Sequence, residues 1–317
     1  MENGENTLVQ KAQMILTQVR KAVVGKDDVL LWALATILAG GHILLEDIPG
    51  VGKTTMALAF SKALGLHCNR IQFTPDVLPS DVTGYSVMNQ QDGQLHYKPG
   101  AVLCNLLLAD ELNRATSRTQ SALLEAMEEG QVTVDGTSHR LPAPFIVMAT
   151  QNPAGAAGTQ LLPDSQMDRF MLRLSLGYPS AADEVAMIMQ RKAGNPLHTL
   201  ETLISQEELL LLQQQVENCH VSDDIMRYAV SLIHATRSHP SLRQGASPRA
   251  TLAVVALSKA VAMLRDRDYV VPEDVKSVFL HAIAHRLQLS DEAVLEKKTE
   301  EYVLQDILAS TKAPALI

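Results

Sequence analysis

The first part of the chain alternates runs rich in apolar residues with segments of helical character. Runs of the length of a β-strand occur at 43–45, 105–111, 145–150 and 171–174. Helix-forming residues follow the first run at 55–59. This alternation continues to about residue 175 and then gives way to helical spacing alone. We therefore predict an α/β domain followed by a helical domain.

Helical spacing of apolar residues characterises the second part of the chain. We predict helices at 181–191, 206–216, 223–236 and 247–264, one that begins at Pro272, and a last one over about 291–308. Between the two parts, Gly177 and Pro179 are typical of a linker. The predicted domains are therefore residues 1–177 and residues 178–317.

Two stretches of the first domain are predicted to form β-hairpins. One covers about 84–99, with Gln91-Asp92-Gly93 as its turn. The other covers about 131–142 and has Asp135-Gly136 at its tip. Each is either a passive structural hairpin or a site of contact with a target. Neither is rich enough in basic or aromatic residues to indicate nucleic-acid binding.

The composition is that of a soluble globular protein, with 46% hydrophobic residues and a formal net charge of −8. An acidic chain without a basic stripe is not typical of a nonspecific nucleic-acid binder. The longest apolar stretch, 29–39, is shorter than the about 18 to 20 residues needed to span a bilayer. The first residues are polar and acidic, unlike a signal peptide, so we expect a cytoplasmic protein without membrane insertion. The scattered cysteines indicate neither disulfides nor a zinc site.

The segment Asp47-Ile48-Pro49-Gly50-Val51-Gly52-Lys53-Thr54 follows the first predicted strand and precedes a helix. Glycines here let backbone N–H groups turn toward a phosphate and approach it closely. Lys53 would reach the β- and γ-phosphates of a nucleotide, and the Thr54 hydroxyl would be a ligand of Mg²⁺. Asp47 stands where the strict phosphate-loop pattern has glycine. An ordinary turn before a helix is the alternative interpretation.

Polar side chains end two further predicted strands. Asp110 and Glu111 end the strand 105–111, and Asn152 follows the strand 145–150. Asp110 would hold Mg²⁺, Glu111 would polarise the attacking water, and Asn152 would orient that water. The alternatives are a solvated acidic pair and a simple turn at Asn152-Pro153.

Two arginines occupy positions from which they could contact an anion. Arg169 lies in Asp168-Arg169-Phe170, just before the strand 171–174, and is predicted to be exposed. There it could complete the site of a neighbouring subunit or form a surface salt bridge. Arg249 follows Ser247 and Pro248, which are predicted to begin a helix, so it lies where anions bind helix N-termini. A capping-region charge without a ligand is the alternative.

Together these segments resemble the AAA+ ATPases, and within them the MoxR family, over nearly the whole chain. The resemblance is carried by 42–54, 70–76, 110–115, 149–153, 166–170 and 245–250. It implies a P-loop core with a central parallel sheet flanked by helices, then an all-α lid domain. It also implies hydrolysis of ATP with the help of Mg²⁺.

The resemblance further implies a role for each candidate residue. The nucleotide would be bound by Asp47, Pro49, Gly50, Val51, Gly52, Lys53, Thr54, Thr55 and Asp110, with Thr54 and Asp110 as the Mg²⁺ ligands. Glu111 would complete the Walker B motif and Asn152 would be sensor 1. Arg169 would be the arginine finger and Arg249 would be sensor 2. We expect the start of the helix 247–264 to hold Arg249 near the nucleotide.

Members of this family are expected to form rings, usually hexamers, with ATP sites between subunits. The resemblance implies a chaperone-like remodeller that acts in maturation or cofactor insertion of a client complex, beside a partner with a von Willebrand factor A domain. A magnesium-chelatase-like metal inserter is a close variant of this hypothesis. A DNA-translocating AAA+ motor and a nucleotide-gated scaffold with little turnover are the alternatives.

Overall fold

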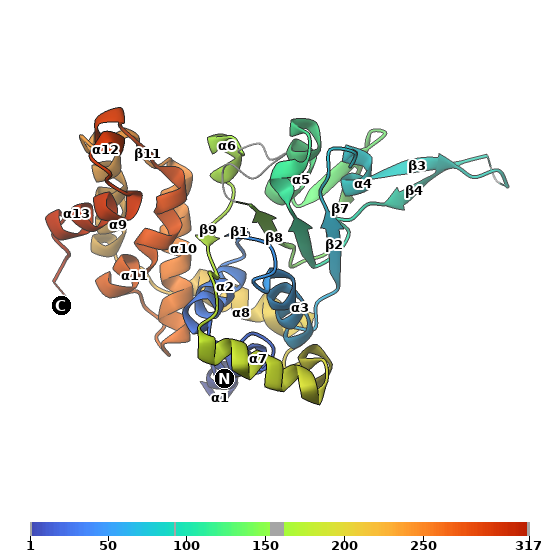
Figure 1. Cartoon of the computed structure of the whole chain (residues 1–317), viewed down its shortest axis with the longest axis horizontal. Helices are drawn as coiled ribbons and strands as arrows, with labels where there is room; N and C mark the ends of the chain where they lie inside the picture. The colour runs from blue at the N-terminus through green and yellow to red at the C-terminus, as the bar shows by residue number, and fades with distance from the viewer. Residues whose placement is uncertain (1, 92, 153–161, 316–317) are drawn as a thin grey trace.

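A central sheet with helices on both faces is joined to a bundle of helices (Figure 1). The computed structural model describes residues 2–91, 93–152 and 162–315. Within these residues, the sheet has the strand order β2-β5-β8-β1-β9, and every neighbouring pair is parallel. The strands are β1 (Ile43–Glu46), β2 (Cys68–Gln72), β5 (Leu106–Asp110), β8 (Ile146–Gln151) and β9 (Leu172–Leu174). Because the strands are parallel, their carboxyl ends meet at one edge of the sheet.

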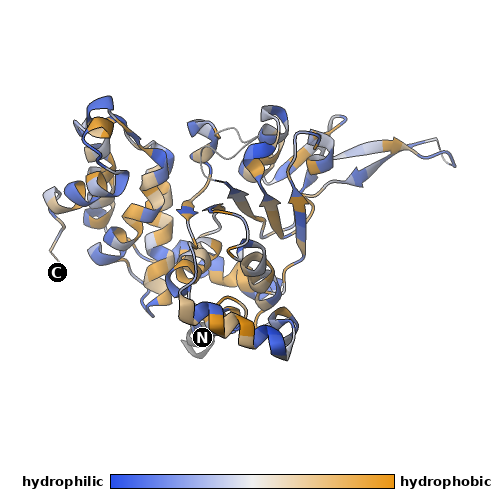
Figure 2. Ribbon diagram, in the orientation of Figure 1, coloured by the Kyte–Doolittle hydropathy of each residue, from blue (hydrophilic) through white to orange (hydrophobic). Residues whose placement is uncertain are grey.

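The helices of the first part surround this sheet. They are α1 (Glu2–Arg20), α2 (Asp27–Leu38), α3 (Lys53–Ala63), α4 (Pro79–Thr83), α5 (Ser117–Glu129) and α6 (Asp164–Met167), with a 3-10 turn at Leu112–Arg114. Successive side chains of β1 enter opposite layers: Ile43 and Leu45 join one core cluster and Leu44 joins the other. Figure 2 shows apolar residues concentrated in the central strands and the inner helix faces.

The second part is helical except for one small ribbon. Its helices are α7 (Ala181–Ala193), α8 (Gln206–Asn218), α9 (Asp223–Ser238), α10 (Pro248–Leu264), α11 (Pro272–Ile283), α12 (Asp291–Leu295) and α13 (Glu300–Ser310), with 3-10 turns at Pro196–Thr199 and Ala284–Arg286. The core cluster on one face of the sheet continues among these helices, from Phe60 of α3 to Leu257 of α10 and Phe279 of α11. The two parts therefore share one hydrophobic core.

Two details of the second part differ from the sequence-based prediction. The expectation of helices alone is wrong at β10 (Leu242–Gln244) and β11 (Gln288–Leu289), which pair antiparallel. Strands this short leave no period-two signal, and their pairing joins distant segments. The predicted last helix is divided into α12 and α13, because Lys297 adopts a φ of 58° and the Thr299 side chain caps the start of α13.

Both predicted hairpins form. β3 (Gly84–Met88) pairs with β4 (Leu95–Pro99), and β6 (Gln131–Val134) pairs with β7 (Thr137–Arg140). The rings of Tyr97 and His139 stack at 3.7 Å between centroids, which joins the two hairpins at their bases. The first hairpin projects away from the sheet (Figure 1). Asp92 of its predicted turn lies outside the described residues.

One buried carboxylate, that of Asp274, connects the end of α10 to the start of α11. Asp274, which is fully buried, forms ion pairs with Arg265 at 2.8 Å and with Arg267 at 2.7 Å. It also accepts a hydrogen bond of 3.0 Å from the backbone N–H of Val271, the residue that caps α11. A buried charge that loses its partners is costly, so this side chain ties the end of α10 to the start of α11.

Among the described residues, no helix combines the length and the apolar character needed to cross a membrane.

We expect Asp274→Ala to lower the free energy of unfolding by about 3 kcal/mol, because it leaves two arginines and a helix start without their acceptor. Urea denaturation followed by the fluorescence of Trp32 would measure this. Trp32 is the one tryptophan of the chain, and its ring lies 4.6 Å from that of His281 on α11. The control is Glu273→Ala, an exposed neighbour expected to change stability by less than about 0.5 kcal/mol. Equal effects of the two substitutions would contradict this account.

Candidate nucleotide-binding site

The loop between β1 and α3 has the backbone of a phosphate-binding loop. Gly50 and Gly52 have φ angles of 89° and 102°, in a region that residues with a side chain rarely adopt. Apart from the glycine and its two neighbours in the chain, no described atom lies within 4 Å of the position that a Cβ would take at Gly50 or Gly52, so the space above the loop is open. α3 begins at Lys53, and its first backbone N–H groups have no partner within the helix. The loop can therefore receive an anion at a helix N-terminus.

The ammonium group of Lys53 is hydrogen-bonded to carbonyl groups of this loop. Its Nζ donates to the carbonyl of Asp47 at 2.7 Å and to that of Ile48 at 3.4 Å. Burial lowers the pKa of Lys53, while the negative charges of Asp47, Asp110 and Glu111 act to raise it. A buried ammonium with only carbonyl partners gains when a more negative ligand approaches.

The carboxylates at the end of β5 are fixed by neighbours on both sides. Asp110 accepts a hydrogen bond of 2.7 Å from Thr150 on β8 and forms an ion pair of 2.7 Å with Arg70 on β2. Thr150 also accepts from the backbone N–H of Glu111 at 2.9 Å. The backbone of Glu111 is left-handed, with a φ of 56°, which is uncommon for a residue with a side chain and is found at functional sites.

Asn152 lies beside Glu111. Its Nδ2 donates to a carboxylate oxygen of Glu111 at 3.4 Å, and its backbone carbonyl accepts from Asn113 at 3.2 Å. Within the described part of the chain, its Oδ1 is buried and has no hydrogen-bond partner. A buried acceptor without a donor is costly, so this atom is suited to receive a hydrogen bond from a ligand or a water. Pro153, the next residue of the motif, lies outside the described residues.

These groups surround a cavity of about 350 Å³. Its lining includes the predicted residues Pro49, Gly50, Gly52, Lys53, Thr54, Thr55, Asp110, Glu111 and Asn152. It also includes Arg70 and Gln72 of β2, which the sequence motifs do not identify as site residues. A signal was available, because both residues lie in the segment 70–76 that carries part of the family resemblance. The sequence did not show that this segment forms a strand that pairs with β5. Open backbone donors, a lysine, a hydroxyl and a carboxylate together suit a polyphosphate bound with Mg²⁺.

The side chain of Asp47 faces away from this cavity. Its carboxylate accepts hydrogen bonds from the hydroxyl of Ser175 at 2.8 Å and from the backbone N–H groups of Leu176 at 2.5 Å and Gly177 at 3.0 Å. Asp47 and Val51 do not line the cavity, and Val51 packs against the hydrophobic core. Binding of a nucleotide by Asp47 and Val51 stays a prediction, and it would involve their backbone, because their side chains lie outside the cavity. The carboxylate of Asp47 instead binds the linker at 175–177.

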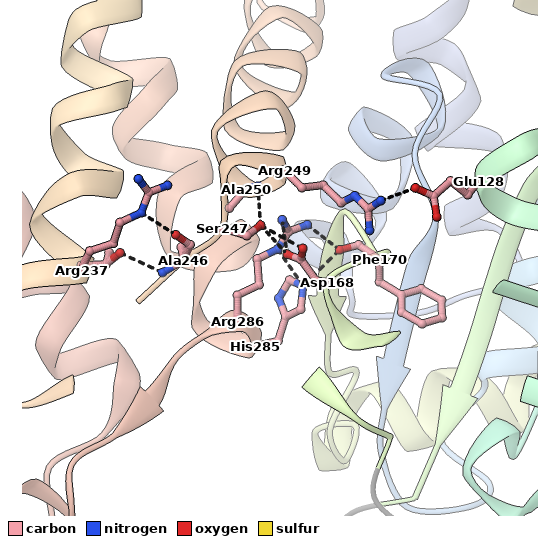
Figure 3. A network of polar contacts seen from close by, with 11 residues as sticks. Glu128, Asp168, Phe170, Arg237, Ala246, Ser247, Arg249, Ala250, His285 and Arg286 are labelled. Carbon is pink, nitrogen blue, oxygen red and sulfur yellow. Dashed lines mark hydrogen bonds and ion pairs between the residues drawn. The ribbon is translucent and has the colours of Figure 1, made fainter. Parts of the chain in front are cut away.

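Arg169 and Arg249 contact the same carboxylate, that of Glu128, and neither lines the cavity. Figure 3 shows the contact of Arg249 with Glu128. Arg169 forms an ion pair of 3.0 Å with one carboxylate oxygen of Glu128 and donates to the carbonyl of Leu124. Arg249 donates to the other oxygen of Glu128. The expectation that Arg249 lies near the nucleotide of its own chain is therefore wrong. The start of α10 is bound to the segment that carries Arg169, and this decides where Arg249 lies.

A buried ion pair makes that connection. Asp168 accepts hydrogen bonds from the hydroxyl of Ser247 at 2.8 and 3.0 Å and pairs with Arg286 at 3.0 Å (Figure 3). The Arg286 side chain is 2% exposed, and burial lowers its pKa to about 10, which leaves it charged at neutral pH. It also donates to the carbonyl of Phe170 at 2.7 Å, as His285 does at 3.1 Å. Removing one partner of such a pair typically costs about 3 to 5 kcal/mol.

Comparisons with known proteins agree with the fold and with the motifs. A model described as the ATPase family associated with various cellular activities matches residues 42–172, and an AAA lid domain model matches residues 234–307. The chain is 36% identical to chaperone MoxR1 of Mycobacterium tuberculosis over 96% of this chain and 83% of that protein. It is 45% identical to YeaC of Bacillus subtilis over 93% of this chain and 92% of that protein.

A solved structure of a protein from Cytophaga hutchinsonii superposes with a TM-score of 0.92 at 35% identity, covering 99% of this chain and 98% of that one. The predicted α/β core with a central parallel sheet, followed by a helical lid domain, is thus confirmed. By its motifs, its fold and these relatives, the chain belongs to the MoxR family of AAA+ ATPases.

Proposed function

We propose that this protein hydrolyses ATP with Mg²⁺ and, as a ring of identical subunits, uses the energy to remodel a client protein. One observation carries the proposal of hydrolysis: Lys53, Asp110, Glu111 and Asn152 converge on one cavity beside the glycine loop. The cavity thus combines a cation for phosphates, a carboxylate for a metal ion, and a carboxylate and an amide for a water.

Each residue has a task in the proposed reaction. Lys53 leaves the carbonyl of Asp47 and binds the phosphates of the substrate. Glu111 takes the proton of the attacking water, and Asn152, 3.4 Å from it, orients that water. Thr54 and Asp110 would hold Mg²⁺, which would neutralise charge on the phosphates when bound.

The proposed ring draws support from the two arginines on Glu128. Arg169 and Arg249 are displaced from the cavity of their own chain, so they can serve the cavity of a second copy. A head-to-tail contact of this kind repeats from copy to copy and gives a ring when the rotation between neighbouring copies closes. An arginine supplied across such an interface is worth about 10³ to 10⁵ in turnover in phosphoryl transfer. We propose a hexamer on the strength of the family.

The chaperone-like role rests on the family and on the projecting hairpin. Met88 and Leu95, near the hairpin's end, are 60% and 61% exposed. Exposed apolar side chains on a projecting element suit contact with another protein. Maturation or cofactor insertion as the task, and a partner with a von Willebrand factor A domain, rest on the resemblance alone. The net charge of −8 does not favour a DNA-translocating motor.

Asp47 connects the phosphate loop to the helical domain in this proposal. Its carbonyl binds Lys53, and its carboxylate binds the linker at 175–177. When Lys53 moves to the phosphates, its bond to this residue breaks. Asp47 therefore has a positioning role in this proposal. Binding of a nucleotide to the loop would shift Asp47, and the shift would move the linker at 175–177 and change the angle of the helical domain.

We expect Glu111→Gln to retain ATP binding and to lose nearly all turnover, because the amide keeps the shape of the side chain but cannot accept the proton of water. Steady-state release of phosphate and equilibrium binding of ATP would measure the two properties. Similar turnover in the variant and the wild type would refute the role of Glu111.

Mixing two inactive variants tests the shared site. Arg169→Ala leaves the cavity of its own chain intact, and Lys53→Ala leaves Arg169 intact. We expect turnover per subunit of the wild type to rise with protein concentration, each variant to be inactive alone, and the mixture to regain part of the activity. Turnover that is independent of concentration and survives the loss of Arg169 would exclude the ring mechanism.

Asp47→Gly restores the strict glycine pattern of the loop but removes the bonds to the linker. We expect ATP affinity to change by less than about threefold while turnover falls by at least about tenfold, or 1.4 kcal/mol in barrier. The matched variant Asp47→Asn keeps the shape and one acceptor oxygen, so its turnover should be intermediate. A loss of affinity as large as the loss of turnover would mean that Asp47 acts on the nucleotide directly.

A further inference from the structure

Glu128 holds arginines from both domains with one carboxylate. It lies in the last turn of α5, with Arg169 on one of its oxygens and Arg249, from the start of α10, on the other. Two guanidinium groups that converge on two oxygens of one anion form a ready-made site for a phosphate, which presents oxygens in a similar way. In the single chain, this site is filled by the protein's own carboxylate.

The position of the two arginines does not depend on Glu128 alone. Asp168 precedes Arg169 in the chain, Ser247 lies two residues before Arg249, and the two are joined by hydrogen bonds of 2.8 and 3.0 Å. The buried Arg286 also pairs with Asp168, at 3.0 Å from a carboxylate oxygen that Ser247 contacts as well. The contacts of Asp168 with Ser247 and Arg286 hold the backbone next to Arg169 and next to Arg249. The two arginines would therefore stay close together if Glu128 were to leave.

The contact with Glu128 is itself exchangeable. The side chains of Arg169, Arg249 and Glu128 are 29%, 41% and 44% exposed, whereas that of Arg286 is 2% exposed. Ion pairs so open to solvent are weak, and water can hydrate the carboxylate once it is released. Glu128, Asp168, Arg169, Arg249 and Arg286 carry three positive and two negative charges, and Glu125 and Glu129 add two negative charges to the hollow that Arg169 and Glu128 line. Release of Glu128 therefore leaves the two arginines near carboxylates that, among the described residues, form no ion pair with them, and an anion that binds both guanidinium groups directly has the advantage of geometry. A terminal phosphate, which is more negative than a carboxylate, competes well for such a site.

We propose that Glu128 is an intramolecular gate: it occupies the phosphate-binding position of the arginine pair, and the terminal phosphate of a nucleoside triphosphate bound to a second copy of the chain displaces it. This inference rests on the proposed function for the identity of the ligand. Glu128 acts through the arginines. It keeps them paired in the separate chain and delays their engagement until a nucleotide-loaded neighbour is in place.

Binding of inorganic tripolyphosphate tests the gate without hydrolysis. The full-length chain with Lys53→Ala serves as the background, because it weakens the anion site of the glycine loop. Adding Glu128→Gln should tighten the Kd for tripolyphosphate by about threefold to tenfold, since the amide keeps the shape but loses the charge that competes. Adding Glu129→Gln removes the same charge from the same hollow but breaks no ion pair with either arginine, so it should tighten the Kd by less than about twofold.

Two results would overturn the gate in this titration. One is a Kd that Glu128→Gln leaves unchanged or weakens. The other is a gain in affinity that persists when Arg169→Ala and Arg249→Ala are added, because the gain would then not pass through the arginines. Circular dichroism and the fluorescence of Trp32 would verify that each variant is folded.

Turnover of ATP supplies the second readout. At protein concentrations below those that saturate assembly, Glu128→Gln should raise turnover per subunit severalfold over the wild type and over Glu129→Gln. It should give no gain when combined with Arg169→Ala. A fall in turnover with Glu128→Gln would overturn the gate and make Glu128 a support that aims the arginines. Absence of turnover in the wild type at every concentration would refute the proposed function, and the tripolyphosphate titration would still decide the inference.

Discussion

The parallel alignment of the central strands is the constraint on which the site depends. Parallel strands have their carboxyl ends at one edge of the sheet, so residues that follow different strands become neighbours there. This brings Asp110 and Glu111 after β5, Asn152 after β8 and the glycine loop after β1 to one cavity. The hydrogen bonds of Thr150 show how closely the order of strands controls the site. This one hydroxyl, at the end of β8, binds the side chain of Asp110 and the backbone of Glu111.

A shared hydrophobic core, together with hydrogen bonds and an ion pair, joins the helical domain to this edge of the sheet. Apolar residues of α3, α10 and α11 belong to one cluster, so burial holds the domains together without specifying a single angle. Hydrogen bonds are directional, so they restrict the angle between the two domains. Asp47 binds the linker at 175–177, and Asp168 binds Ser247 and Arg286. Asp47 follows β1 and Asp168 precedes β9, so these contacts connect the sheet to the linker and to the helical domain through hydrogen bonds.

The charged contacts of this protein divide by burial into permanent and exchangeable ones. Asp274 in the helical domain and Arg286 at the joint are buried and fully paired, and loss of a partner there leaves an isolated charge in the interior. The pairs of Glu128 and the pair between Arg70 and Asp110 involve arginines with 29% to 51% of the side chain exposed. Such pairs can be exchanged for a ligand at small cost. In this structure, the exchangeable contacts lie where the proposed reaction requires charges to move.

The sequence by itself determined the chemical groups of the site and most of the elements that carry them, although not β2, β10 or β11. The glycine loop, the carboxylates after a buried strand and the linker with Gly177 are local patterns, because backbone angles and burial leave their mark within a few residues. Pairing between distant segments leaves no such mark. The sequence therefore did not reveal that Arg70 pairs with Asp110, that Asp47 turns to the linker, or that β10 pairs with β11. Only the tertiary structure decided that Arg249 lies with Arg169 on Glu128, because that position follows from the packing of α10 against the segment after α6.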